Sequence, residues 1–504
     1  MVTDANRWKA MSVALVAGFM TLLDVSIVNV ALPSIRTDLD LSAGELQWVL
    51  SGYALTFGLL LVPAGRFGDA RGRRNVFIVG VALFTLSSAA AGLAQSALFL
   101  VVARLIQGAA AGVVNPQVSG LIQQLFEPRE RGRPFGLLGA TIGVSTAVGP
   151  LLGGLLIALF GAESGWRWIF YINVPIGVAA IVLAMRYLPG PVGGPAKRES
   201  LDPAGVPVKR ESPGPAKRES LDPVGVLLLG TSVLLLLIPL VQEREWHGPA
   251  KWLLIPAGLA VLAGFLVWER RHGRRDTPVI DLELFRVRSY ALGALIGTLY
   301  FAGFPVIFFT YTLYLQNGLG LSALASGLAV TPFAVGAAAA SALGGRLVAR
   351  SGRPLVVTGL VMVAAGLGAT VLVLALVAGR GGVWAATVPL LLAGLGSGLV
   401  ISPNQTLTLA EVPVKRAGSA GAVLQTGQRI GTALGIAVAG TVFFARLADS
   451  GNDWVHALRA ALFVSIGFVL VALVAAVIDV LASKRESQRA SAGERVHETA
   501  GRSG

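Results

Sequence analysis

A carboxylate, Asp24, lies in the middle of an apolar stretch that runs from Met11 to Pro33. The stretch is long enough to cross a bilayer as a helix. A charged side chain at that depth costs about 2.5–3.5 kcal/mol on insertion scales, so such residues usually mark the path of a proton, an ion or a substrate. We therefore expect Asp24 to bind a proton, a cation, or both in turn. The alternative is a structural acid that pairs with a neighbouring helix.

A second ionisable residue, Arg104, lies in the apolar segment 97–121, three residues before Gln107. A guanidinium does not readily release its proton, so Arg104 can act only through its fixed positive charge. Close to Asp24 that charge favours the ionised carboxylate, and separation removes the effect. The sequence thus predicts a proton-coupling pair of Asp24 and Arg104. The alternative for Arg104 is a structural arginine near the membrane surface.

Other polar and aromatic side chains in apolar segments are candidates for a substrate cavity. Gln425, Arg429 and Thr432 follow i, i+4, i+7 spacing and share one helix face. Tyr300, Phe304, Phe308 and Tyr311 form a stripe that Pro305 interrupts, and aromatic rings can stack on flat or cationic drugs. Helix packing remains an alternative for both groups. The predicted cavity residues are Asn29, Gln107, Tyr300, Phe304, Gln425 and Arg429.

The elements that must position these residues are membrane helices. The chain has 504 residues, of which 54% are hydrophobic and only 13% charged, whereas soluble domains carry about 25% charged residues. Its mean hydropathy is +0.71. We predict an all-α membrane protein with fourteen spans: 11–33, 46–64, 75–94, 97–121, 134–160, 168–185, 223–241, 252–268, 289–315, 322–344, 354–378, 382–408, 419–444 and 460–481.

The charged residues predict an orientation. Most of the 41 Lys and Arg residues fall in the loops after even-numbered spans and in the two tails, which places both termini in the cytoplasm by the positive-inside rule. The net charge of +14 is therefore a topology signal, supplemented by contact with anionic lipid, and not evidence for nucleic acid. We expect a multi-pass protein of the inner (plasma) membrane, without an obligate protein partner.

Spacing along the chain predicts two six-helix halves, 1–188 and 289–482, separated by a linker at 189–222 and by two inserted helices with a basic loop at 223–288. The linker repeats a ten-residue segment, 194–203, at 214–223, and its Pro, Gly and charged residues predict a flexible tether. The tail 483–504 is expected to be disordered.

A glycine- and arginine-rich turn follows the second span. Its residues are Gly65, Asp69, Gly72, Arg73 and Arg74, in the spacing Gly-x3-Asp-x2-Gly-Arg-Arg. Asp69 at a helix end could pair with the arginines or with a helix N-terminus, which would make a latch that breaks and reforms. This turn resembles the signature loop of the major facilitator superfamily. A degraded copy lies at 345–353, with Ala349 in place of the acid, which suggests a weaker second latch.

Five further segments resemble motifs of the same superfamily. The run from Arg104 to Gly108 is similar to its motif for proton transfer, and Gly149, Pro150, Gly153 and Gly154 are similar to its antiporter motif in the fifth helix. Residues 23–33, 166–177 and 314–332 resemble the fourteen-helix drug:proton antiporter branch. The resemblance implies two helical halves that rock around a central cavity and export a drug in exchange for protons.

We therefore expect a proton-driven efflux antiporter for lipophilic drugs or antibiotics. The alternative is a major facilitator transporter of another small solute, such as an amino acid, a siderophore or a sugar. An enzyme is disfavoured because the spans hold no clustered His, Asp or Ser, so we expect no catalytic residue, metal or cofactor. An ATP-driven pump lacks its phosphate-binding loop, and a non-transporting sensor would depend on the linker.

Overall fold

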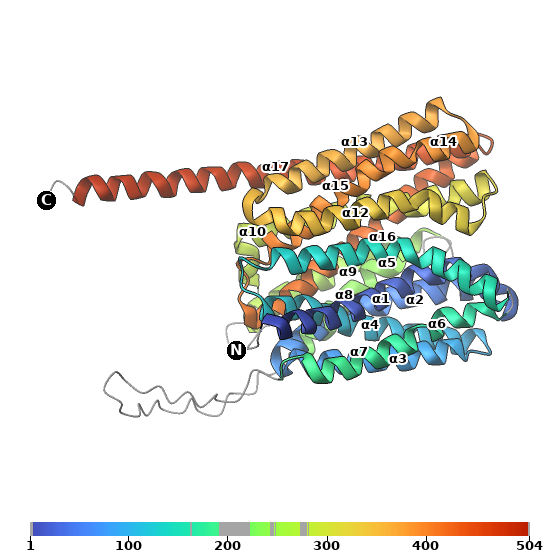
Figure 1. The fold of residues 1–504 in the computed structure, drawn as a ribbon, viewed down its shortest axis with the longest axis horizontal. Coiled ribbons are helices and arrows are strands. Elements are labelled where there is room, and N and C mark those ends of the chain that lie inside the picture. The colour runs from blue at the N-terminus through green and yellow to red at the C-terminus, as the bar shows by residue number, and fades with distance from the viewer. Residues whose placement is uncertain are drawn as a thin grey trace.

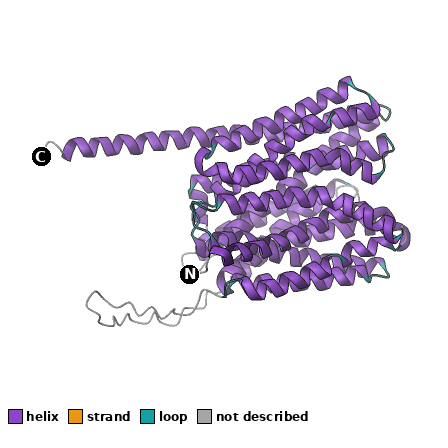
Figure 2. Ribbon diagram, in the orientation of Figure 1, coloured by secondary structure: helices purple, strands orange, loops and turns teal. Residues whose placement is uncertain are grey.

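A computed structural model describes residues 4–161, 164–190, 222–241, 246, 248–272, 280 and 282–501. Throughout these residues the regular structure is helical, and no strand is present (Figures 1 and 2). Thirteen helical segments are long and apolar enough to span a membrane, and a shorter apolar helix covers Val224–Pro239. The predicted all-α membrane fold is confirmed. The predicted span 223–241 corresponds to the shorter apolar helix.

The N-terminal helices are consecutive along the chain and pack together. They are α1 (Asp4–Asp38), α2 (Ala43–Arg71), α3 (Arg73–Gly92), α4 (Ala97–Leu125), α5 (Gly132–Phe160), α6 (Trp168–Tyr171) and α7 (Asn173–Tyr187). Two inserted helices follow, α8 (Pro223–Val241) and α9 (Leu254–His272). Serine caps begin α2 and α4, where Ser42 and Ser96 accept backbone N–H groups of the first turn.

The C-terminal helices complete the bundle. They are α10 (Arg288–Gly303), α11 (Val306–Leu313), α12 (Ala323–Ser351), α13 (Pro354–Leu376), α14 (Gly379–Ala385), α15 (Thr387–Thr408), α16 (Ala417–Asp449) and α17 (Trp454–Gly501). Short 3-10 turns cover Gly165–Arg167, Pro249–Leu253, Leu282–Arg286 and Val414–Arg416, and a π-turn covers Tyr314–Gly318. The start of α1 and the extension of α17 lie at one end of the bundle, which we call the terminal end (Figure 1).

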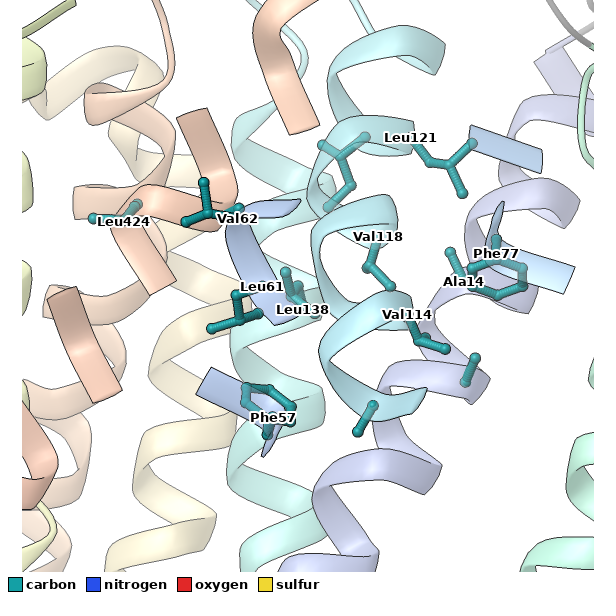
Figure 3. Close-up of a cluster of buried hydrophobic side chains, with 14 of the residues drawn as sticks. Ala14, Phe57, Leu61, Val62, Phe77, Val114, Val118, Leu121, Leu138 and Leu424 are labelled. Atoms are coloured by element: carbon teal, nitrogen blue, oxygen red, sulfur yellow. The ribbon is translucent and has the colours of Figure 1, made fainter. Parts of the chain in front are cut away.

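The two sets of helices meet along two seams. In one seam α5 packs on α12, and in the other α2 and α4 pack on α16. The inserted helix α8 contacts both α2 and α16, so it lies beside the second seam. One buried apolar cluster runs across this seam, because Phe57 and Leu61 of α2 and Val118 of α4 belong to the same cluster as Leu424 of α16 (Figure 3).

Glycines let the helices of both seams approach closely near the terminal end. A Cβ on Gly132 would lie 2.3 Å from the Gly345 carbonyl oxygen, and a Cβ on Gly65 would lie 2.6 Å from the Gly418 carbonyl oxygen. Contacts this short exclude any side chain larger than hydrogen unless the helices separate. The terminal ends of the two helix sets are therefore packed together in this structure.

Three predicted spans each consist of two helices. The 289–315 span lies within one apolar segment, Arg288–Gly318, which divides into α10 and α11 at Pro305, where the missing N–H and the ring interrupt helical hydrogen bonding. The 168–185 span divides into α6 and α7, and the 382–408 span into α14 and α15.

Beyond Ser483, α17 continues to Gly501 and projects from the bundle (Figure 1), and the disorder expected for the tail 483–504 stays a prediction. The tail contains several Arg, Glu and Ala residues, which are good helix formers, and no Pro. The linker repeats lie outside the described residues.

A cluster of hydrogen bonds around Asp38 connects the N-terminal helices at the end of the bundle opposite the terminal end. Asp38, at the end of α1, accepts a hydrogen bond of 3.0 Å from Trp166 Nε1 and one of 2.9 Å from Arg167 Nη2. Arg167 also donates to the carbonyl oxygens of Gly92 and Ala94 after α3. The Trp166-Arg167 pair therefore ties the ends of α1 and α3 together.

We expect Gly132→Ala to lower the thermal unfolding midpoint of the purified protein, because overpacking a tight contact costs about 1–3 kcal/mol. Gly154→Ala is the matched control on the same helix, since a Cβ there meets no atom within 4 Å. Alanine is a better helix former than glycine, so the control should hold or raise the midpoint. Equal shifts in the two variants would contradict a close α5–α12 approach.

Candidate functional site

Asp24 lies at the centre of a buried polar cluster formed by the N-terminal helices. Its side chain is completely buried, and Arg104 Nη1 donates to Asp24 Oδ2 at 2.5 Å. Asp24 Oδ1 accepts two further hydrogen bonds, at 2.9 Å from Gln107 Nε2 and at 3.1 Å from Asn173 Nδ2. The structure thus brings together Asp24, Arg104 and Gln107, with α7 supplying a fourth residue.

Arg104 is held by more than the carboxylate. Its Nε donates to the Val49 carbonyl oxygen at 3.1 Å, and its Nη1 also donates to Gln107 Oε1 at 2.8 Å. The guanidinium carbon lies 4.3 Å from the centroid of the Tyr53 ring, a cation–π contact. Since Gln107 follows Arg104 by three residues on α4, both side chains reach the same side of α1.

Asn173 is a site residue that the sequence patterns do not single out. Its Nδ2 donates to Ser88 Oγ at 3.0 Å as well as to Asp24, whereas its Oδ1 is buried without a hydrogen-bond partner among the described residues. A signal is nevertheless present, because Asn173 is an amide at the start of the apolar segment 173–187.

Two glycines of α5 allow a close approach to α1 just after Asp24. A Cβ on Gly149 would lie 2.3 Å from Ser26 Oγ, and one on Gly153 would lie 3.0 Å from Ile27 Cγ1. Pro150 lies within α5 and faces Gly327 of α12, where an added Cβ would meet the proline ring at 3.3 Å. Gly154 has open space around it. The predicted antiporter motif therefore includes two glycines that seat α1 and one position without a close neighbour.

Asp69 joins the two helix sets at the terminal end. It accepts hydrogen bonds from the backbone N–H groups of Gly418, at 3.0 Å, and Ser419, at 2.8 Å, which belong to the first turn of α16. A carboxylate at a helix N-terminus satisfies unpaired N–H groups and the positive end of the helix dipole. This acid on α2 therefore caps a helix of the other set.

Arg73 completes this contact. Its Nη2 donates to Asp69 Oδ1 at 2.8 Å and to the Val414 carbonyl oxygen at 2.5 Å, so it also crosses between the helix sets. Gly72, with φ +97°, makes the sharp turn between α2 and α3. Arg74 donates to the Met185 carbonyl oxygen within the N-terminal helices.

The degraded copy of this turn makes a different contact. Arg353 pairs with Asp479, and both residues belong to the C-terminal helices, in the turn before α13 and in α17. Since Ala349 stands where the acid would be, this copy places no carboxylate opposite α5. The described contact therefore holds one set of helices together without bridging the two.

Two predicted cavity residues of α16 lie at the seam with α2 and α4. Gln425 Nε2 donates to Ser119 Oγ at 3.2 Å, which crosses between the helix sets. Arg429 is half-buried, and its guanidinium carbon lies 4.3 Å from the Phe57 ring centroid. Among the described residues Arg429 makes no hydrogen bond or ion pair, so its charge is balanced by no carboxylate there.

The remaining predicted cavity residues lie elsewhere. Tyr300 is buried in the core of the C-terminal helices, donates to Ser397 Oγ at 2.7 Å and stacks on Phe304 at 5.5 Å between centroids. Phe304 also stacks on Phe333 of α12. Asn29 is exposed on α1 and bonds only its own helix, at the Val25 carbonyl oxygen. The structure does not bring these three residues to the Asp24 cluster.

The arrangement places a carboxylate and a guanidinium in a buried ion pair, and within the residues the structure describes no group of three metal-ligating side chains occurs. Protonation of Asp24 would remove the negative charge that holds Arg104. Removal of one partner from a buried pair leaves an uncompensated charge, which is why such pairs respond strongly to a single proton.

Arg104→Gln should destabilise the protein by about 3–5 kcal/mol, because it leaves the Asp24 carboxylate buried and unpaired. Asp24→Asn combined with Arg104→Gln should recover part of that loss, since no charge then remains in the cluster. The measurement is the thermal unfolding midpoint of Arg104→Gln, Asp24→Asn and the double variant in one detergent. Strictly additive losses would contradict direct coupling between the two side chains.

Asp69→Asn should shift the population away from the joined terminal ends about tenfold, because a charge-assisted contact is worth about 1.5–3 kcal/mol. The chain has no cysteine, so spin labels on Arg71→Cys and Glu411→Cys report a single distance between the helix sets. We expect that distance to lengthen in Asp69→Asn and to stay unchanged with Glu127→Gln, an exposed acid nearby. An unchanged distance in both would rule out the latch.

Comparisons with known proteins agree with this architecture. The family model of the Major Facilitator Superfamily matches residues 14–436. A probable actinorhodin transporter of Streptomyces coelicolor is 38% identical over 455 residues, which cover 89% of this chain and 74% of the relative. A puromycin resistance protein of Streptomyces alboniger is 34% identical over 498 residues, which cover 94% and 91% of the two chains.

A solved structure shows the same fold. The proton:xylose symporter of this superfamily superposes with a TM-score of 0.62 at 16% identity, over 94% of this chain and 95% of the symporter. The match of the family model over most of the chain and the helical membrane architecture lead to one conclusion. This chain belongs to the major facilitator superfamily and is a multi-pass membrane transporter of small molecules, not an enzyme.

Proposed function

We propose that this protein is a proton-driven antiporter that exports lipophilic drugs or antibiotics by alternating access. The observation that carries the proposal is the fully buried Asp24, which is paired with Arg104 at 2.5 Å inside the membrane-spanning helices. A carboxylate at this depth is a natural proton site. The names of the two Streptomyces relatives, a transporter and a resistance protein for antibiotics, support export as the direction.

In the proposed cycle Asp24 takes up a proton when it faces the outside and releases it when it faces the cytoplasm. Protonation weakens the attraction to Arg104 and adds an O–H group that needs an acceptor. Asn173 Oδ1, which is buried beside Asp24 without a partner among the described residues, can become that acceptor by rotation of the amide. Gln107 and Asn173 thus act as positioning residues for both protonation states.

The drug is proposed to bind between the helix sets, where Gln425 and Arg429 lie against α4 and α2. The unbalanced charge of Arg429 disfavours a dication and suits a neutral or singly charged substrate. The assignments of Asn29, Tyr300 and Phe304 to the cavity stay predictions, as do the domain boundaries at 188, 222, 288 and 482. The latch at Asp69 is proposed to close the cytoplasmic side.

The protein is proposed to lie in the inner (plasma) membrane with both termini in the cytoplasm, so that the terminal end is the cytoplasmic end. The positive-inside distribution of Lys and Arg supports this orientation. Its proposed partners are the exported drug, protons and membrane lipid. A second candidate function is transport of another small solute, which the fold shared with a proton:xylose symporter keeps open.

Asp24→Asn should abolish substrate-driven proton movement while leaving folded protein in the membrane, because an amide cannot carry the proton. The measurement uses inside-out vesicles energised to an acidic lumen, to which puromycin, other antibiotics and cationic dyes are added one at a time. Addition of a substrate should release lumenal protons in the wild type.

The matched control is Asp40→Asn, an acid-to-amide change at an exposed position whose φ of +48° asparagine tolerates. It should retain the wild-type proton signal. Full proton release by Asp24→Asn would end the proposal for this residue. Drug export that continues after the proton gradient is collapsed would argue for a different energy source.

A further inference from the structure

A cavity of about 390 Å³ lies at the terminal end, on the seam between α5 and α12. Arg7 and Trp8 of α1 line one side together with Arg129 and Arg133, which precede and begin α5. Arg346 of α12 lines the other side. Its volume falls within the range of about 300–1,000 Å³ that is usual for small-molecule sites. The transport cycle proposed above does not use it.

The cavity is strongly basic. Four arginines line it, and the acid among its lining residues, Glu130, is engaged by Arg7, whose Nη1 and Nη2 donate to the carboxylate at 2.7 and 3.2 Å. Arg129 and Arg346 are exposed and make no hydrogen bond or ion pair in the part of the chain that the structure describes. Two guanidinium groups, one from each helix set, are therefore free for an anion.

The walls are held in place by buried contacts. Arg131, which is 2% exposed, fixes the turn before α5 by donating to the carbonyl oxygens of Phe126 and Gln123. Trp8 packs edge-on against Phe126 at 4.9 Å between centroids, and the Arg133 guanidinium lies 4.7 Å from the Trp8 ring centroid. With Arg131 turned inward, Arg129 and Arg133 face outward beside an aromatic wall.

The cavity also lies at the boundary of the membrane. The apolar spans Asn6–Leu32 and Gly132–Phe160 begin beside it, and the spans Ala97–Leu125 and Leu324–Ser351 end beside it. Tryptophan and arginine at the end of membrane spans lie at the level of the lipid headgroups. The cavity therefore lies where an anionic headgroup would be present.

We propose that this cavity binds the phosphodiester headgroup of an anionic phospholipid. Guanidinium groups bind phosphate oxygens with paired, charge-assisted hydrogen bonds, and Arg129 and Arg346 supply such groups from opposite walls. Trp8 and Phe126 contact the glycerol and the first methylenes. The bound lipid joins α5 to α12 next to the Gly132–Gly345 contact, so it stabilises the state in which the terminal ends are packed together.

The test is native mass spectrometry of the purified full-length protein, which counts retained phosphatidylglycerol molecules against phosphatidylcholine. Arg129→Gln with Arg346→Gln should weaken the tightest phosphatidylglycerol adduct about tenfold or more, because both phosphate contacts are lost. Arg350→Gln is the control, since Arg350 is an exposed arginine on the same helix that does not line the cavity. The control should bind as the wild type does.

Competition with inorganic phosphate and glycerol phosphate distinguishes binding of a lipid from binding of a soluble phosphate. Retention of phosphatidylglycerol in the presence of either compound supports a lipid site. Complete displacement of phosphatidylglycerol by an equal concentration of either compound overturns the proposal. In the protein labelled at Arg71→Cys and Glu411→Cys, with the cavity arginines intact, phosphatidylglycerol should also shorten the distance between the two spin labels. Equal retention of both lipids by the wild type, or unchanged binding in the double variant, would overturn the proposal without affecting the proton step.

Discussion

The ion pair between Asp24 and Arg104 is the constraint on which the rest of this structure depends. Two opposite charges inside a low-dielectric bundle attract strongly, yet each loses its hydration. The protein offsets that loss with polar contacts from neighbouring helices: Gln107, Asn173 and the Val49 carbonyl oxygen. These contacts fix the positions of α1, α2, α4 and α7 relative to one another. A single proton at Asp24 therefore changes the balance of interactions across the whole N-terminal set.

A second contact links this set of helices to the other. Asp69 of α2 caps α16, and α2 also carries Tyr53, which lies against Arg104, and Phe57, which lies against Arg429. The rings of Tyr53 and Phe57 stack at 6.2 Å between centroids. One helix thus contacts the buried ion pair, the candidate cavity and the latch. The proposed coupling between proton uptake and opening of the terminal end would run along α2.

The sequence predicts the membrane fold and the family well, because both depend on long-range patterns: repeated apolar spans and the spacing from Gly65 to Arg74. It also indicates Asp24 and Arg104, since a charge in an apolar segment is conspicuous. The sequence pattern does not identify Asn173, because an amide costs less free energy to bury than a charge and is less conspicuous in an apolar segment. Its role depends on a contact 149 positions away in the chain.

Other differences have equally local causes. The stripe containing Tyr300 and Phe304 is compatible with a cavity or a core. Tyr300 belongs to the buried cluster of the C-terminal helices and Phe304 packs against it, while the cavity assignment stays a prediction. The break at Pro305 is visible in the sequence, but the helix resumes so soon that the pattern resembles one span. The helix α17 continues into the tail, whose Arg, Glu and Ala residues are good helix formers.

The most direct test of this mechanism is to measure the protons released when substrate binds to the purified protein in weakly buffered detergent solution. If substrate binding and protonation of Asp24 exclude each other, addition of a substrate should release protons from the wild type and none from Asp24→Asn. Substrate binding to the wild type without any proton release would contradict the central role assigned to the Asp24–Arg104 pair.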